Sequence, residues 1–253
     1  MSNKEHFNLK RKIFHLIGLI IPVIFFFDIP MLFNLNIFKN DTRSFLFYIL
    51  IFLTLFMLFI EFMRFQFSSW QKIFLKITAP LLKKDETDKV HGSLPFIASS
   101  ALIVGFLPKE IAVLSFLFLL AGDPAAAYAG SRFGTIRFKN GKSIQGTAAA
   151  AIVCFVSGLI FLLFLSMNNN LNKEAYNLYL IKQGIINYKA FIVILTGAIS
   201  AALLELISRR GFLDDNLIVP IGSGLFMTLL TAFLYNKSFS QIFYSIFDLL
   251  IPF

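Results

Sequence analysis

Residues 120–150 read LAGDPAAAYAGSRFGTIRFKNGKSIQGTAAA. The first half of this stretch is apolar enough to sit in a membrane, except for Asp123. A glycine-rich segment with four basic residues follows, and the chain then becomes apolar again. This order predicts two membrane helices joined by a basic loop, with an acid inside the first helix.

The composition of the whole chain extends this interpretation. Of 253 residues, 57% are apolar and 15% are charged, whereas soluble domains carry about 25% charge. Mean hydropathy is +0.77. We therefore expect one all-α polytopic membrane domain covering residues 1–253. Cys154 is the only cysteine, which excludes a disulfide within the chain and a cysteine-rich zinc site.

Apolar runs predict about seven transmembrane helices. The third is short and contains Pro95, so we expect it to be tilted, broken or partly re-entrant. The C-terminal tail is either a short eighth span or an interfacial helix, and Asp248 in its middle favours the interface. The expected spans are 12–30, 44–63, 92–107, 110–130, 146–167, 188–208 and 216–235.

The distribution of positive charge sets the expected orientation. The net charge is +9, and Lys and Arg are more than twice as frequent in the N-terminus and alternate loops as in the remaining loops. The positive-inside rule then places the N-terminus in the cytoplasm, at the inner membrane if the source is bacterial. The same rule explains the positive net charge of the chain, so nucleic-acid binding is not expected. The first apolar run follows a basic patch at 10–12 and is expected to remain as an uncleaved span.

This orientation gathers the polar candidates on the cytoplasmic side. An acid embedded in a membrane protein indicates a functional site, although Asp123 could also be a helix-end carboxylate. Its small neighbours leave room for close helix packing or for a ligand. In the loop that follows, glycine backbone, basic side chains and a helix start near Ser143 would suit a phosphate. The candidates are Gly122, Gly130, Arg132, Gly134, Lys142, Ser143 and Gly146.

A Walker A loop is excluded, because its first glycine would stand at 136, where the chain has Ile136. A second acidic segment, Asp214–Asp215–Asn216, precedes the last long span. Its carboxylates suit Mg²⁺ beside phosphates. They could instead cap the helix, which accounts for one acid more easily than for two.

Other polar residues support this face. Glu61 and Arg64 lie on one helical face, and Glu205 lies near Arg209, so each pair could be an interfacial ion pair. His15 near the first span is more simply structural. With three histidines and no paired spacing, a zinc site is not expected.

Five motifs together resemble the family of polyprenol/dolichol kinases, phytol kinases and CTP-dependent diacylglycerol kinases. They are RKIFHL (11–16), EFMR (61–64), GDPAAAYAGSRFG (122–134), KSIQGT (142–147) and DNLIVPIGSG (215–224). The resemblance implies a CTP-dependent lipid kinase that uses Mg²⁺ or another divalent cation and phosphorylates a lipid alcohol. It implies catalytic roles for Asp123, Lys142 and Asp215, with both acids on the metal, and nucleotide contacts by Asn216 and the loop. Gln145 departs from the Glu found in many relatives.

Two alternatives remain open from the sequence. A phosphatidate cytidylyltransferase would need a similar site, but its usual late signature is absent. A small transporter would place polar residues near mid-bilayer and on both faces, whereas this chain concentrates them on one. The sequence leaves the lipid acceptor, the general base and the oligomeric state undetermined.

Overall fold

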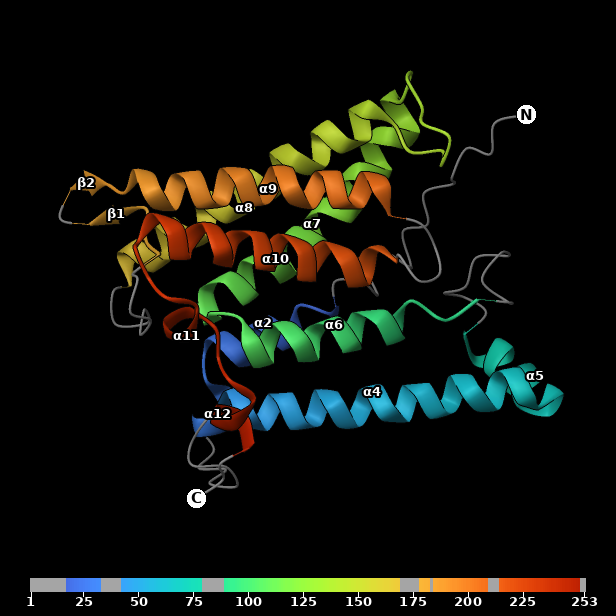
Figure 1. The fold of residues 1–253 in the computed structure, drawn as a ribbon. Coiled ribbons are helices and arrows are strands. Elements are labelled where there is room, and N and C mark those ends of the chain that lie inside the picture. Colours follow the sequence, from blue (N-terminus) through green and yellow to red (C-terminus); the bar gives the residue numbers. More distant parts are fainter. Residues whose placement is uncertain are drawn as a thin grey trace.

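The computed structural model describes residues 17–32, 42–78, 89–168, 178–182, 184–208 and 214–250. Long antiparallel helices fill most of this part of the chain (Figure 1). The long elements are α4 (Thr42–Gln66), α6 (Ser93–Phe106), α7 (Lys109–Phe133), α8 (Ile144–Met167), α9 (Tyr188–Ile207) and α10 (Asp215–Leu234). Shorter ones are α2 (Ile20–Phe26), α3 (Ile29–Leu32), α5 (Ser68–Thr78), α11 (Phe239–Ile242) and α12 (Ile246–Leu250), with a hairpin of β1 (Ile181–Lys182) and β2 (Ile185–Ile186).

The expectation of an all-α polytopic membrane protein is confirmed. Among the described residues, five helices are long and apolar enough to cross a membrane: α4, α7, α8, α9 and α10. Their bounds agree with the spans expected there. The sixth apolar helix, α6, has 14 residues, about 21 Å at 1.5 Å per residue, so it is shorter than a hydrocarbon core of about 30 Å. It is one continuous helix, because Pro95 lies in the first turn, where a missing N–H is tolerated.

The N-terminal and C-terminal segments differ from simple spans. The described part of the first expected span is divided into α2 and α3 at Asp28, whose φ is 51°. The Asp28 carboxylate pairs with Lys109 Nζ at 2.6 Å. In the tail, α11 and α12 are each too short to span a bilayer. Tyr48 donates to the Leu249 carbonyl at 3.0 Å, so α12 is held against the start of α4.

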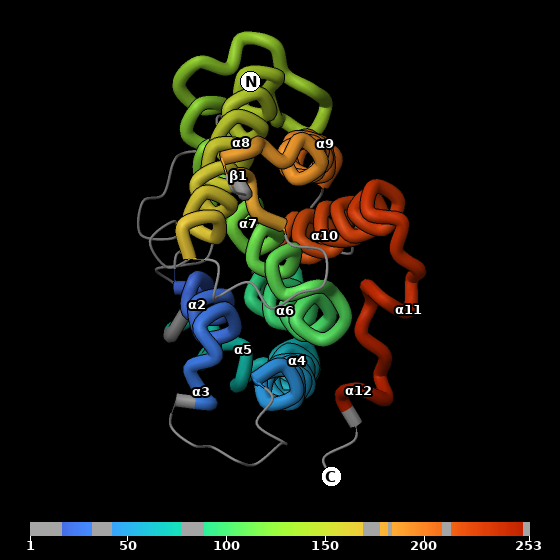
Figure 2. The backbone as a smooth tube through the Cα atoms, turned by 90° about the vertical axis from the view of Figure 1, so that its left-hand side faces the viewer, coloured from blue at the N-terminus to red at the C-terminus, as the bar shows by residue number. Residues whose placement is uncertain are grey.

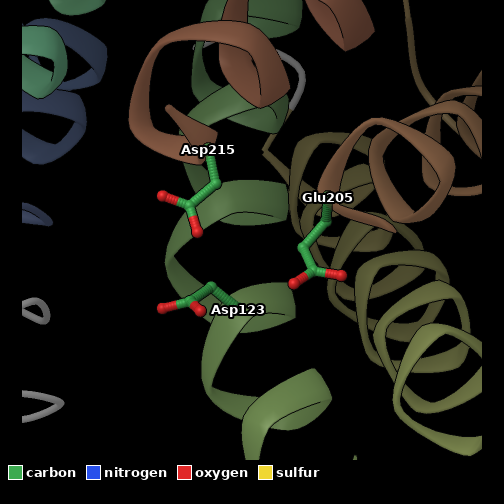
Figure 3. A group of neighbouring side chains, drawn as sticks. All are labelled: Asp123, Glu205 and Asp215. Carbon is green, nitrogen blue, oxygen red and sulfur yellow. The ribbon is translucent and has the colours of Figure 1, made fainter. Parts of the chain in front are cut away.

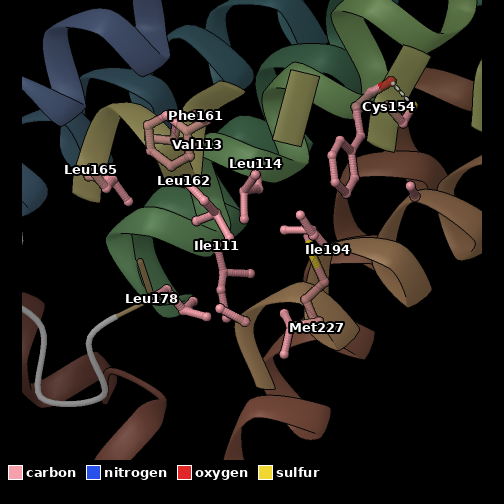
Figure 4. Close-up of a cluster of buried hydrophobic side chains, with 14 of the residues drawn as sticks. Ile111, Val113, Leu114, Cys154, Phe161, Leu162, Leu165, Leu178, Ile194 and Met227 are labelled. Carbon is pink, nitrogen blue, oxygen red and sulfur yellow. Dashed lines mark hydrogen bonds between the residues drawn. The ribbon is translucent and has the colours of Figure 1, made fainter. Parts of the chain in front are cut away.

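Helix α7 is the centre of the packing. In its most apolar window 61% of the residues are buried, against 22% in α4. Figure 2 shows α8, α9 and α10 on one side of α7 and α2 and α6 on the other, with α4 beyond α6. The first group forms a large apolar core drawn in Figure 4, with Ile111, Leu114, Leu162, Ile194 and Met227 at its centre.

Glycines allow these helices to approach one another closely. A Cβ atom at Gly197 on α9 would lie 2.5 Å from Met227 Sδ on α10, and one at Gly224 would lie 2.5 Å from Leu107 Cδ1. Small residues at such positions let membrane helices pack backbone to backbone. Because successive helices alternate in direction, the ends of α4, α7 and α9 meet the starts of α6, α8 and α10 at one end of the bundle (Figure 1). We call this the site end.

Helix α5 generates a prediction about the membrane. It follows α4 at the site end (Figure 1). It carries Trp70, the single tryptophan of the chain, which is 47% exposed, together with Lys72 and Lys76. An amphipathic helix with these residues lies in the interface between lipid and water.

We therefore expect lipids brominated near the headgroup to quench Trp70 fluorescence more strongly than lipids brominated at the chain ends. The measurement is made on the unmodified protein in bilayers. Stronger quenching by the deep label would show that α5 lies within the hydrocarbon instead.

Candidate functional site

Three carboxylates meet at the site end. Asp123 comes from the middle of α7, Glu205 from the last turn of α9 and Asp215 from the first position of α10 (Figure 3). Each offers a carboxylate oxygen that lies within 4.8 Å of an oxygen of the other two. Glu205 is only 9% exposed, and the other two residues are partly buried. We call these three residues the acidic cluster.

Close packing of α7 and α8 places Asp123 in this cluster. A Cβ atom at Gly122 would lie 2.7 Å from Cys154 Sγ on α8. Nearer the loop, a Cβ at Gly146 would lie 2.7 Å from the Ala126 carbonyl oxygen. Because side chains are absent at these contacts, α7 can run deep in the bundle while Asp123 reaches α9 and α10.

Two neighbouring acids at the start of α10 have different roles. Asp214 is the N-cap, and its Oδ1 accepts from the backbone N of Asn216 at 3.0 Å and from its Nδ2 at 2.9 Å. Burial and the neighbouring Asp215 charge raise the pKa of Asp214 to about 7. Capping therefore accounts for Asp214, and Asp215 joins the acidic cluster. The Asn216 carbonyl accepts from Ser99 Oγ of α6 at 2.7 Å.

Lys142 joins the loop between α7 and α8 to α9. Its ammonium lies 2.9 Å from Glu205 Oε1 and donates to Ser208 Oγ at 2.5 Å and to the Glu205 main-chain carbonyl. Glu205 was expected to pair with Arg209, which lies outside the described residues. Within the described part of the chain, its cationic partner is Lys142, which is 63 positions away in sequence.

The other loop residues mainly hold the loop together. Arg137 donates to the carbonyls of Gly130 and Gly141 at 2.7 and 2.9 Å. A Cβ at Gly134 would lie 2.3 Å from the Gly130 carbonyl oxygen. Ser143 is buried and caps α8 by accepting from the backbone N of Gly146 at 3.1 Å.

Arg132 lies on α7 well away from the acidic cluster. It lies nine residues beyond Asp123, about 13 Å along the axis, and donates to Tyr128 Oη at 3.0 Å. Gln145 also lies in this outer region and bonds with Thr135, its Nε2 donating to Oγ1 at 2.5 Å. The structure thus brings Lys142 to the acidic cluster and leaves Arg132 exposed.

The Glu61–Arg64 pair forms a second polar cluster at the site end. The two side chains pair at 2.5 Å, as the sequence predicted, but both are buried within the protein instead of extending to its surface. Arg64 also donates to the Lys89 carbonyl at 2.5 Å, and the backbone N of His91 donates to Glu61 at 3.3 Å. These bonds fix the approach to α6.

Contacts from α6 connect this second cluster with the start of α10. A Cβ at Gly92 would lie 3.2 Å from Asn216 Nδ2. Sequence reasoning did not identify Gly92, Ser99 or Ser208 as part of the site, because they join it only through contacts with residues distant in sequence. His15, which was expected near this face, lies outside the described residues.

A small, mostly apolar cavity adjoins the acidic cluster. Its lining includes Ala150 and Cys154 from α8 and Ala201 and Ala202 from α9, beside Asp123 and Glu205. Apolar space therefore lies directly against the carboxylates. Three carboxylate donors at this spacing also fit a hard divalent cation such as Mg²⁺, which prefers oxygen ligands and uses few protein carboxylates when phosphates are present.

Comparisons with known proteins confirm the resemblance given by the motifs. A protein named CTP-dependent diacylglycerol kinase 1 from Eremothecium gossypii is 25% identical over 182 residues, covering 70% of this chain and 56% of the relative. The protein of the same name from Saccharomyces cerevisiae is 26% identical over 179 residues, covering 70% of this chain and 60% of the relative. The chain thus spans less than two thirds of these two relatives.

A further relative is comparable in length. An uncharacterised protein of Rickettsia prowazekii is 23% identical over 229 residues, covering 88% of this chain and 94% of the relative. No family model matches the sequence. No solved structure matches it either.

The acidic cluster generates a prediction about metal binding. We expect the purified protein to bind Mn²⁺, and Asp123→Asn to weaken that binding about tenfold or more because it neutralises one carboxylate of the acidic cluster. Electron paramagnetic resonance of unbound Mn²⁺ measures the affinity. Asp248→Asn, at the opposite end of the bundle, is the control and should leave it unchanged. Equal affinities for wild type and Asp123→Asn would contradict this assignment.

Proposed function

We propose that the chain is a CTP-dependent lipid kinase that transfers the γ-phosphate of CTP to the hydroxyl of a membrane lipid alcohol. The proposed acceptor is diacylglycerol, the lipid named in the curated relatives, rather than polyprenol, dolichol or phytol. The proposed site faces the cytoplasm, since the loops at the site end carry the larger share of basic residues.

The observation that carries this proposal is the acidic cluster beside an apolar cavity. A soluble triphosphate needs a cation and positive charge, whereas a lipid hydroxyl needs an apolar approach. Asp123, Glu205 and Asp215 could hold the cation, and Ala150, Ala201 and other apolar residues line the space directly beside these carboxylates. Phosphoryl transfer depends mainly on positioning and charge neutralisation, which this arrangement suits.

Individual residues take the following roles in the proposal. Asp123 and Asp215 would hold the divalent cation, which when bound offsets negative charge on the triphosphate. Asn216 and the backbone around the α8 start would contact the nucleotide. The lipid enters sideways between helices and brings its hydroxyl to the carboxylates.

The transfer itself is balanced without a further reactant. A bond forms between the lipid oxygen and the γ-phosphorus, and the bond from that phosphorus to the bridging oxygen of the β-phosphate breaks. CDP leaves with the electron pair. The hydroxyl proton passes to a carboxylate, for which Glu205 and Asp215 are the candidates because both lie in the acidic cluster.

A transfer assay tests the proposed function. Purified protein with Mg²⁺ and γ-labelled CTP should phosphorylate diacylglycerol in a panel that also contains polyprenol and phytol. Label in the lipid and release of CDP support the kinase. Release of pyrophosphate with a phosphatidate substrate would select the cytidylyltransferase, and failure with every lipid would contradict both.

Substitution of the acids gives a second, more specific prediction. Asp123→Asn and Asp215→Asn should each lower kcat/KM about 100-fold or more, because each neutralises a carboxylate that holds the cation. Asp248→Asn is again the matched control, since Asp248 caps a short turn at the other end of the bundle. Activity of the two site variants within about threefold of wild type would exclude these residues from catalysis.

A further inference from the structure

The hydrogen bonds of the Lys142 ammonium are all directed to the end of α9. A lysine ammonium has three N–H donors. The Lys142 ammonium has three acceptors, namely Glu205 Oε1, the Glu205 main-chain carbonyl and Ser208 Oγ. In this arrangement no donor remains for a phosphate oxygen. A direct phosphate contact would require Lys142 to break a bond with the end of α9.

The end of α9 is a favourable place for this ammonium. The last carbonyls of a helix lack partners within the helix and carry partial negative charge, so a cation there is stabilising. Ser208 is buried, and its hydroxyl also donates to the Glu205 carbonyl at 2.8 Å. Lys142, Ser208 and the last turn of α9 therefore form one hydrogen-bonded unit.

Glu205 connects this unit to the acidic cluster. One of its carboxylate oxygens pairs with Lys142, and its carboxylate also belongs to the group with Asp123 and Asp215. Three carboxylates and one ammonium together carry a net charge of −2 when all are ionised. One divalent cation would balance this charge, whereas three carboxylates without Lys142 would keep a residual negative charge.

We propose that Lys142 is a positioning residue that acts through Glu205, holding its carboxylate in the acidic cluster and setting the charge of that cluster, rather than a phosphate-binding residue. The proposal rests on the proposed function for its kinetic part. It differs from the direct role that the sequence assigns to Lys142, and the two roles predict different kinetics.

Kinetics separate the two roles. If Lys142 acts through Glu205, Lys142→Met should lower kcat about 30-fold or more and change KM for CTP by less than about threefold. Glu205→Gln should give a similar pattern. Lys142→Arg should restore a large part of kcat, because guanidinium can also pair with Glu205. A phosphate-binding role predicts instead a rise in KM for CTP of about tenfold or more.

A double-mutant cycle gives the most specific kinetic test. The Lys142→Met/Glu205→Gln double variant should be no more than about threefold slower than the slower single variant, since both remove the same interaction. If the double variant instead loses kcat by the product of the two single-variant factors, the proposal is overturned. Lys72→Met, on the exposed side of α5, is the control for loss of a lysine.

Metal binding tests the same pair without enzyme activity. Removing the ammonium from beside a carboxylate of the acidic cluster removes the repulsion between that ammonium and a bound cation. Lys142→Met should therefore bind Mn²⁺ about tenfold more tightly than wild type in the absence of CTP. In the Glu205→Gln background the same substitution should tighten binding by a smaller factor than in the wild type, because the carboxylate that the ammonium neutralises is already gone. Unchanged affinity in the single variant would overturn the proposal.

The Mn²⁺ affinities also separate a failure of the Lys142 proposal from a failure of the proposed kinase function. Absence of phosphate transfer by the wild type would remove the proposed kinase function, while the Mn²⁺ affinities would still test the link between Lys142 and Glu205. Thermal unfolding and gel filtration in detergent identify a variant that has lost its fold. For such a variant, Lys142→Gln replaces Lys142→Met in the same cycle and must show the same tightening of Mn²⁺ binding.

Discussion

Three carboxylates side by side at the end of an apolar bundle are a costly arrangement, and much of the surrounding structure compensates for it. Like charges at this spacing repel, and partial burial removes the water that would screen them. The protein places one ammonium, from Lys142, against the most buried of the three acids. The remaining negative charge favours binding of a cation, and a metal-bound triphosphate is the ligand that we propose for this site.

The rest of the bundle keeps these charges in position. Glycine contacts between α7 and α8 allow the helix that carries Asp123 to lie close to its neighbours. Asp214 caps α10 and orients Asn216, while Ser99 on α6 holds the Asn216 carbonyl. The buried Glu61–Arg64 pair then fixes the segment that leads into α6. Helices from distant parts of the sequence thus converge on one small region.

Local patterns predicted much of this architecture. Apolar runs gave five long helices to within a few residues, and alternation of helix direction with basic loops placed Asp123, Glu205 and Asp215 at one end. Hydrophobicity and charge were sufficient for these predictions, because each helix and each basic loop lies within one continuous segment. The first apolar run is divided at Asp28, which pairs with Lys109, 81 positions away, and no local pattern reveals this contact.

Roles within the site were harder to predict, since they depend on which segments meet. In the structure the glycines at 130, 134 and 146 allow the loop and the two helices to touch, while their expected contact with phosphate stays a prediction. Lys142 could not be assigned to Glu205 from sequence, because a contact across 63 positions requires the fold. Neutral contributors such as Ser208 and Gly92 act through hydrogen bonding or close approach and left no charge signal.

The central claim is that one ion contacts both the protein carboxylates and the CTP phosphates. Electron–nuclear double resonance on Mn²⁺ bound to ¹³C-labelled protein with CTP tests it most directly. The account predicts ¹³C couplings from carboxylates and ³¹P couplings from phosphates on the same ion. Protein-bound Mn²⁺ that shows carboxylate couplings without phosphorus, or CTP-bound Mn²⁺ that shows no carboxylate coupling, would contradict it.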